Sequence, residues 1–138
     1  MSKHQTGITD VVPQHGRHLF FVAQPGCSAE RALLALRHNA DGHTVVAGLG
    51  QSLLLALGRN VPGLAVFPSY AGAGFEVPST PFAMWCWLRG NDRGELAHLS
   101  RHLEQALAPD LALSQCIDVF KYQSGLDLTG FEDGTENP

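Results

Sequence analysis

Residues 83–123 read AMWCWLRGNDRGELAHLSRHLEQALAPDLALSQCIDVFKYQ, and their pattern predicts a strand, a helix and a second strand. The stretch opens with apolar and aromatic residues, as buried strands do. Asp92, with Glu95 three positions later, resembles a capping box and begins an amphipathic helix that runs to about Leu107. Leu113 to Gln123 then alternates as a strand does. The carboxyl-terminal half of the chain therefore folds as strand, helix, strand.

The same order is predicted nearer the amino terminus. Arg17 to Gln24 contains a short apolar run bounded by glycine and proline, which is typical of a buried strand. Ser28 is a candidate cap for the helix that follows, and His43 to Leu49 is the next strand. A short helix over Gln51 to Gly58 and a long loop, rich in Gly and Pro, over Arg59 to Pro81 connect the two halves. Loops of that length usually have a function or cover another surface.

This order of elements is the split β-α-β pattern of a ferredoxin-like α+β sandwich. It predicts a four-stranded antiparallel sheet with both main helices on one face, so the other face is left to pack against something else. A length of 138 residues suits one compact core, and we expect residues 1–138 to form a single domain.

Composition narrows the possible partners and compartments. The formal net charge of -4 provides no basic surface for nucleic acid, which we do not expect as a partner. No apolar run approaches the ~20 residues that span a bilayer, so we expect no membrane association. Met1 to Thr9 is polar, unlike a secretory signal, which indicates a cytoplasmic protein. Cys27, Cys86 and Cys116 fit reduced thiols, and the last two lie in apolar segments where packing is expected.

Two further patterns could indicate a metal site or a redox role, but each has a simpler structural interpretation. His98 and His102 stand four residues apart on the predicted helix, a spacing at which two histidines can bind one metal ion. Both lie on the polar side of the helix, which favours the interpretation that they are exposed to solvent. Trp85 and Trp87 alternate on one strand and should point to one face, which favours packing in a core or interface over a redox role.

Gly48-Leu49-Gly50 lies between a strand and a helix, as a dinucleotide-binding loop does. Leu53 occupies the position of that motif's third glycine, so a tight turn is the better interpretation.

The last nine residues are rich in residue types that favour turns. They read Gly130-Phe131-Glu132-Asp133-Gly134-Thr135-Glu136-Asn137-Pro138. This segment also matches the G-x-x-D-G signature of dye-decolorizing-type (DyP-type) haem peroxidases and the residues that usually follow it. Upstream segments are similar to the same family, most closely to its bacterial class without an export signal. These segments are Gln5 to Ile8, His18 to Phe21, Val45 to Leu54 and Pro78 to Pro81.

The resemblance implies the amino-terminal half of a protein with two ferredoxin-like halves that hold haem b between them. Such a protein uses hydrogen peroxide to oxidise dyes and other aromatic compounds. Asp133 would be the distal acid–base residue, and its low ordinary pKa leads us to expect an acidic optimum. The residues expected to contact the cofactor are Gly130, Phe131, Glu132, Gly134 and Thr135.

The family's proximal histidine belongs to the second half, so we expect no metal ligand in this chain and at most weak haem binding by it alone. The uncovered sheet face should then promote a homo-oligomer, for example a dimer. The alternative is a non-catalytic ferredoxin-like module for ligand binding or dimerisation that keeps the signature as an inherited turn. Asp133 distinguishes the two hypotheses, because only the peroxidase needs it.

Overall fold

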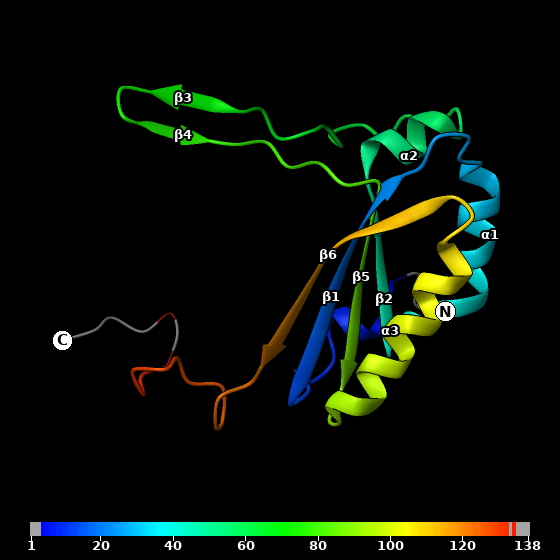
Figure 1. The fold of residues 1–138 in the computed structure, drawn as a ribbon. Coiled ribbons are helices and arrows are strands. Elements are labelled where there is room, and N and C mark those ends of the chain that lie inside the picture. The colour runs from blue at the N-terminus through cyan, green and yellow to red at the C-terminus, as the bar shows by residue number, and fades with distance from the viewer. Residues whose placement is uncertain (1–3, 133, 135–138) are drawn as a thin grey trace.

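A computed structural model of the chain describes residues 4–132 and 134 (Figure 1). Its elements follow the predicted order, preceded by one turn of 3-10 helix and interrupted by a small hairpin. They are η1 (Thr6–Ile8), β1 (His15–Ala23), α1 (Ala29–Asn39), β2 (Val45–Leu49), α2 (Gln51–Ala56), β3 (Tyr70–Gly72), β4 (Phe75–Val77), β5 (Met84–Gly90), α3 (Arg93–Leu107) and β6 (Leu111–Phe120).

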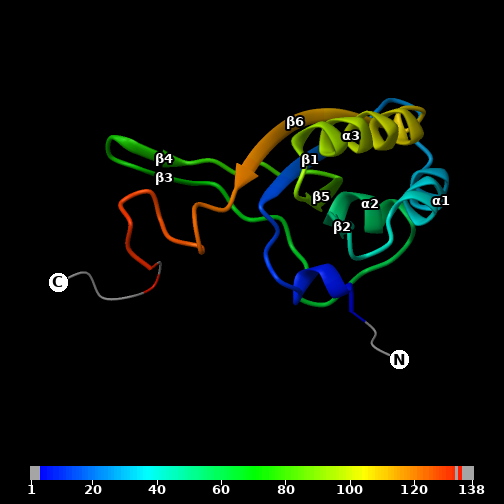
Figure 2. The ribbon, with the colours of Figure 1, turned by 90° about the horizontal axis from the view of Figure 1, so that it is seen from below.

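Four strands form one antiparallel sheet in the order β2-β5-β1-β6. Helices α1 and α3 both lie against one face of this sheet, as the two views show (Figures 1 and 2). This arrangement is the ferredoxin-like α+β sandwich that the sequence predicts. It also leaves the other face of the sheet without a covering layer of helices.

The core lies between the sheet and the two helices because alternate strand residues point toward them. Leu19 and Phe21 of β1 are fully buried together with Met84, Cys86 and Leu88 of β5. The helices contribute small and branched residues at helical spacing. These are Ala32 and Leu36 of α1, and Leu96, Leu103 and Leu107 of α3.

Both main helices begin at side-chain caps. The Ser28 hydroxyl accepts a hydrogen bond from the backbone N–H of Arg31, and Asp92 Oδ1 accepts one from the N–H of Glu95 at 2.8 Å. Each cap satisfies a donor that would otherwise lack a partner in the first helical turn. The two predicted helix starts are thereby confirmed.

The segment 59–81 differs from the loop that the sequence predicts, because it contains the β3–β4 hairpin. Tyr70 pairs with Val77, and the turn passes through Gly74, whose φ of 83° suits glycine. Both strands are exposed along their whole length. Figures 1 and 2 show this segment, named the arm here, projecting on the side of the sheet opposite α1 and α3.

The amino-terminal residues cover one edge of the sheet. The side-chain amide of Gln5 bonds both the N–H and the carbonyl of Ala47 in β2, at 2.8 and 2.7 Å. Gly7 lies so close to Val46 that a Cβ there would be 2.6 Å from its side chain. Strand β2 is therefore protected from pairing with another chain, a common need of edge strands.

The cysteines differ in environment. Cys86 is fully buried, as expected, and burial raises the pKa of its thiol to about 12. Cys116 is exposed, so the expectation that it packs in an apolar environment is wrong. Its strand, β6, is exposed from residue 114 onward because it lies at the edge of the sheet, where α3 covers little of it. Among the described helices, none has the length and apolar character needed to cross a membrane.

Candidate functional site

The sheet face turned away from α1 and α3 carries a concentration of aromatic side chains. The register fixes its members, because residues paired across antiparallel strands share a face. His18 pairs with Trp87 and Ile117, and Phe20 pairs with Trp85. We name this set the free face. It consists of Gly16, His18, Phe20, Val46, Gly48, Trp85, Trp87, Arg89, Gln115, Ile117 and Val119, of which Val46 is buried.

Three rings dominate the free face. The His18 imidazole lies nearly parallel to the Trp85 indole, with ring centroids 5.6 Å apart and planes at 9°. It is also nearly parallel to Trp87, at 5.9 Å and 14°. The two tryptophans thus share one face of β5, as the alternation predicts, and they contact a histidine from the neighbouring strand.

Two glycines provide the space for the indoles. A Cβ on Gly16 would lie 2.8 Å from Trp87 Nε1, and one on Gly48 would lie 3.0 Å from Trp85 Cε3. Contacts this short would displace the rings. The indole positions therefore depend on the absence of side chains at both glycines.

The Trp85 indole N–H donates a hydrogen bond of 3.1 Å to His18 Nδ1. An indole nitrogen can only donate, so Nδ1 accepts and the imidazole proton is on Nε2. Burial lowers the pKa of His18, which favours this neutral form. The free face thus holds a neutral imidazole whose lone pair points at an indole proton.

Arg89 lies beside Trp87, with its guanidinium carbon 4.9 Å from the ring centroid. Its Nη atoms donate to the carbonyls of His43 and Val11, at 3.1 and 2.6 Å. Arg89 is buried, and its Nε has no hydrogen-bond partner within the described part of the chain. Its permanent charge therefore sits at one end of the aromatic group.

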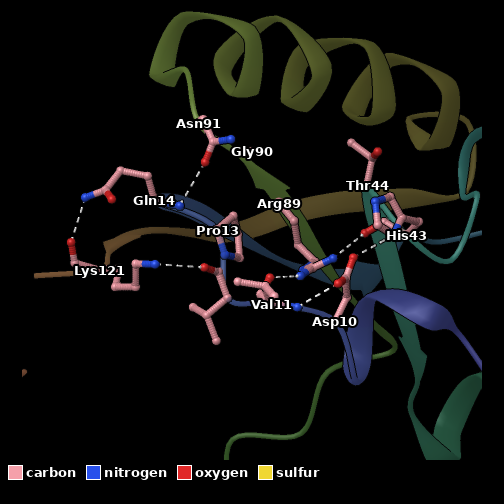
Figure 3. A pocket seen from close by; sticks show the side chains of 11 residues that line it. Asp10, Val11, Pro13, Gln14, His43, Thr44, Arg89, Gly90, Asn91 and Lys121 are labelled. Atoms are coloured by element: carbon pink, nitrogen blue, oxygen red, sulfur yellow. Dashed lines mark hydrogen bonds and ion pairs between the residues drawn. The ribbon is translucent and has the colours of Figure 1, made fainter. Parts of the chain in front are cut away.

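A hollow of about 370 Å³ lies next to Arg89, between residues 10–14 and Lys121 (Figure 3). Its polar side chains mainly bond the backbone. Lys121 Nζ donates to the Val12 carbonyl at 3.4 Å, and Asn91 accepts from the Gln14 N–H at 3.0 Å. These contacts anchor the amino-terminal residues to the sheet, so we assign this hollow a structural role.

The predicted signature follows β6. Gly130 N–H bonds the Asp127 carbonyl, and Asp127 N–H bonds the Phe131 carbonyl, both at 3.0 Å, so the chain folds back on itself. Gly130 and Gly134 have φ values of 92° and 82°, which explains the glycines of the signature. Phe131 is 49% exposed and Glu132 is bridged to Leu126. Asp133 and Thr135 lie outside the described residues.

This segment and the arm lie on the same side of the sheet as the free face (Figures 1 and 2). A hollow of about 430 Å³ lies at the end of β6, where Val119 of the free face lines it together with Phe120, Leu126 and Leu128. One end of the free face therefore lies beside residues 126–128, which precede the signature segment in the chain.

The simpler interpretations of the remaining motifs agree with the structure. His98 and His102 are exposed on α3, as the prediction of a solvated helix face requires. Gly50 begins α2 at a site where a Cβ would be 1.9 Å from the Phe82 carbonyl, so it serves packing.

Sequence analysis missed two residues of this surface, His18 and Arg89. His18 lies in β1, within the segment that the sequence predicts as a strand, but its spacing from the other histidines matches no ligand pattern. Alternation along this strand, with Leu19 and Phe21 in the core, was the signal that could have placed His18 beside the tryptophans.

The chain resembles solved DyP-type peroxidases. DypB from Rhodococcus jostii RHA1 has a TM-score of 0.70 and 22% identity over 94% of this chain and 46% of its own. The encapsulated DyP-type peroxidase from Mycobacterium smegmatis has a TM-score of 0.71 and 20% sequence identity, and the match covers 95% of this chain and 47% of that protein. A putative DyP-type peroxidase from Shewanella oneidensis has a TM-score of 0.70 and 22% sequence identity, and the match covers 100% of this chain and 49% of that protein. DypB variants are described in complex with heme.

Neither a family model nor a curated protein matches the chain. The likeness to the solved structures shows that this chain has the fold of about half of a DyP-type peroxidase, and it spans about half of their length.

Proposed function

We propose that this chain is the amino-terminal half of a DyP-type haem peroxidase, in which Asp133 is the distal acid–base residue. The observation that carries the proposal is the structural likeness over at least 93% of the chain to peroxidases of about twice its length. The signature segment supports it, because it begins shortly after β6, on the side of the free face.

The described residues suit one wall of a haem pocket. Porphyrin is a flat, largely apolar ring, and the free face offers Phe20, Ile117 and Val119 beside its three stacked rings. A Cβ on Gly130 or Gly134 would meet no atom within 4 Å, so a ligand has room to approach the backbone there. When bound, haem supplies the iron that hydrogen peroxide oxidises.

The signature residues would then have distinct roles. The Asp133 carboxylate takes a proton from one oxygen of hydrogen peroxide and delivers it to the other, which leaves as water. Gly130, Phe131, Glu132, Gly134 and Thr135 would border the haem. Because a carboxylate remains ionised at lower pH than an imidazole, the activity is expected to be highest in the acid range.

The remaining partners follow from the same proposal. A second ferredoxin-like half would cover the free face and provide the iron ligand, since the exposed Ile117 and Val119 need a cover. Dyes and other aromatic compounds would be the reductants. We further propose a cytoplasmic location and a homo-oligomeric state.

The first experiment is a titration of the 138-residue chain with hemin, alone and together with a second half, followed by the Soret band. We expect a weak shift with the chain alone and a saturable shift with both halves. Peroxide reactivity is then measured for Asp133→Asn and for the control Glu136→Gln, which changes a nearby carboxylate in the same segment. Loss of the acid–base residue should slow the reaction roughly 10²- to 10⁴-fold, while the control stays near the native rate.

Two outcomes would contradict the proposal. The absence of saturable binding with both halves would refute the haem protein as a whole. Unchanged peroxide reactivity in Asp133→Asn would refute the acid–base role and favour a non-catalytic module that retains the signature as a turn.

A further inference from the structure

We infer that Gln14 is a positioning residue for Asp133, because it clamps Lys121, which joins β6 to the segment that carries Asp133. Asp133 has a catalytic role only in the proposed function, on which this inference therefore rests. The clamp itself consists of described residues, and it can be tested in the chain without haem.

Three hydrogen bonds join Lys121 to the residues just before β1. Its backbone N–H donates to the Gln14 carbonyl at 2.9 Å, and its carbonyl accepts from Gln14 Nε2 at 2.7 Å. Lys121 Nζ donates to the Val12 carbonyl at 3.4 Å (Figure 3). His15 pairs with Phe120, so the two Gln14 bonds continue the ladder between β1 and β6 by one residue beyond both strands.

Gln14 is itself fixed to the end of β5. Its backbone N–H donates to Asn91 Oδ1 at 3.0 Å, directly after that strand. The residues before Gln14 are held by the buried Arg89 of β5, whose Nη2 donates to the Val11 carbonyl at 2.6 Å. The guanidinium charge strengthens this hydrogen bond. Lys121 is therefore clamped against a piece of chain that β5 anchors at two points (Figure 3).

Beyond Lys121, residues 122–132 form a loop that hydrogen bonds of its own hold together. The Tyr122 carbonyl accepts from the N–H groups of Gly125 and Leu126, at 2.9 and 3.1 Å. Leu126 also forms a bridge to Glu132, the residue that precedes Asp133 in the chain. The loop is thus expected to move as one piece.

Side-chain packing does little to fix this loop against the domain. Leu128 is 73% exposed and Phe131 is 49% exposed, and the hollow at the end of β6 lies beside the loop. The orientation of the loop therefore depends on its root at Lys121. Proton transfer needs its donor and acceptor within hydrogen-bond reach, so a small displacement of the Asp133 carboxylate would slow the reaction.

The clamp is tested in the 138-residue chain by Gln14→Met, which keeps the length of the side chain but removes its N–H donor. Nuclear magnetic resonance measures amide hydrogen exchange at Lys121 and the order parameters of residues 122–131. We expect exchange at Lys121 to become roughly two- to tenfold faster, as the loss of one hydrogen bond predicts. The order parameters of the loop should fall, while those of β1 and β5 stay native.

Gln24→Met is the matched control. Gln24 lies directly after β1, and its Nε2 also donates to a backbone carbonyl, that of Ala108. This substitution should leave Lys121 and the loop as they are in the native chain.

Native exchange at Lys121 in Gln14→Met would overturn the clamp. Equal loosening of β1 and β5 would overturn it as well, because it would show a general loss of stability. Gln14 is exposed, so Gln14→Met should fold. If it does not, Gln14→Asn provides the same comparison, because it withdraws the amide from the Lys121 carbonyl by one methylene group.

A double-mutant cycle in the haem-loaded protein tests whether Gln14 acts through Asp133. Gln14→Met should slow the reaction with hydrogen peroxide roughly tenfold or more, while hemin affinity stays native. In the Asp133→Asn background the same substitution should have no further effect, because the carboxylate that it displaces is already absent.

Two results of this cycle would refute the positioning of Asp133. One is a native peroxide rate in Gln14→Met, and the other is an equal loss of rate in both backgrounds. Failure of hemin to bind with both halves present would refute the proposed function, and the role of Asp133 with it. Exchange at Lys121 would still decide whether Gln14 clamps the root of the loop.

Discussion

The carboxylate of Asp110 connects the two halves of the fold. It accepts hydrogen bonds from Arg31 Nε and Nη2, at 2.8 and 2.6 Å, and from the backbone N–H of Ser28 at 2.7 Å. Asp110 is buried at the turn between α3 and β6, while its partners lie at the start of α1. The interaction therefore fixes α1 against the opposite half of the domain.

This contact makes stability depend on pH. The Arg31 hydrogen bonds, with the Ser28 N–H, hold the pKa of Asp110 below its ordinary value of 3.8. The unfolded state thus binds more protons than the folded state as the pH falls through this range. The stabilisation is complete above pH 3.8 and is lost as the pH falls through the lower, folded-state pKa. We expect Asp110→Asn to be less stable than the native chain in urea at pH 7, with a smaller difference near pH 2.

The control is Glu30→Gln, an exposed carboxylate in the first turn of α1. Its urea midpoint should follow that of the native chain at both pH values. A difference between Asp110→Asn and the native chain that grows on acidification would contradict the assignment.

Contacts between residues that are far apart in the chain, such as Asp110 and Arg31, leave no local pattern from which they could be predicted. Asp110 follows Pro109 and is explained locally as the end of a helix, whereas Arg31 is 79 positions away. His18 and Trp85 are 67 positions apart. Pairs of this kind become visible only when the strand register is known, because one shift in register would turn His18 away from the tryptophans.

Among the elements, those with a buried face were predictable and those without one were not. The helices show apolar residues at a spacing of three and four, and β1 and β5 are apolar because they lie in the middle of the sheet. Strands β3 and β4 have three residues each and no buried side, so burial leaves no pattern in their sequence.

The arm should be the first part of the domain to be cut by chymotrypsin. It exposes Phe67, Tyr70 and Phe75, at 60, 56 and 64%, and an isolated two-stranded hairpin is only marginally stable. Cleavage there needs local opening, whereas cleavage at the buried Phe21 needs global unfolding. With a stability of about 5 kcal/mol, the arm should be cut roughly 10³-fold faster or more.

The nicked domain should remain folded, because β5 pairs with both β1 and β2 and so holds the fragments on either side of the arm together. Mass spectrometry identifies the cut and size-exclusion chromatography shows whether the fragments co-elute. First cleavage within the sheet would contradict this view of the arm.

At the scale of the whole molecule, the arm, the free face and the signature segment all lie on one side, and α1 and α3 on the other (Figure 2). The free side carries the aromatic rings together with Ile117 and Val119, which are 47 and 39% exposed. An uncovered apolar surface of this kind attracts a partner. When the 138-residue chain is studied alone, another copy of itself is the partner available.

We therefore expect the isolated chain to self-associate through the free face, and sedimentation equilibrium over a range of concentrations measures this. Ile117→Glu places a carboxylate in the contact, and burying it without a counter-charge should weaken association at least about tenfold. Leu34→Glu is the matched control, because Leu34 is 54% exposed on α1, away from the free face. It should associate as the native chain does. Equal weakening by both substitutions would place the contact elsewhere, and a native chain that stays monomeric throughout would show that the free face needs a different partner.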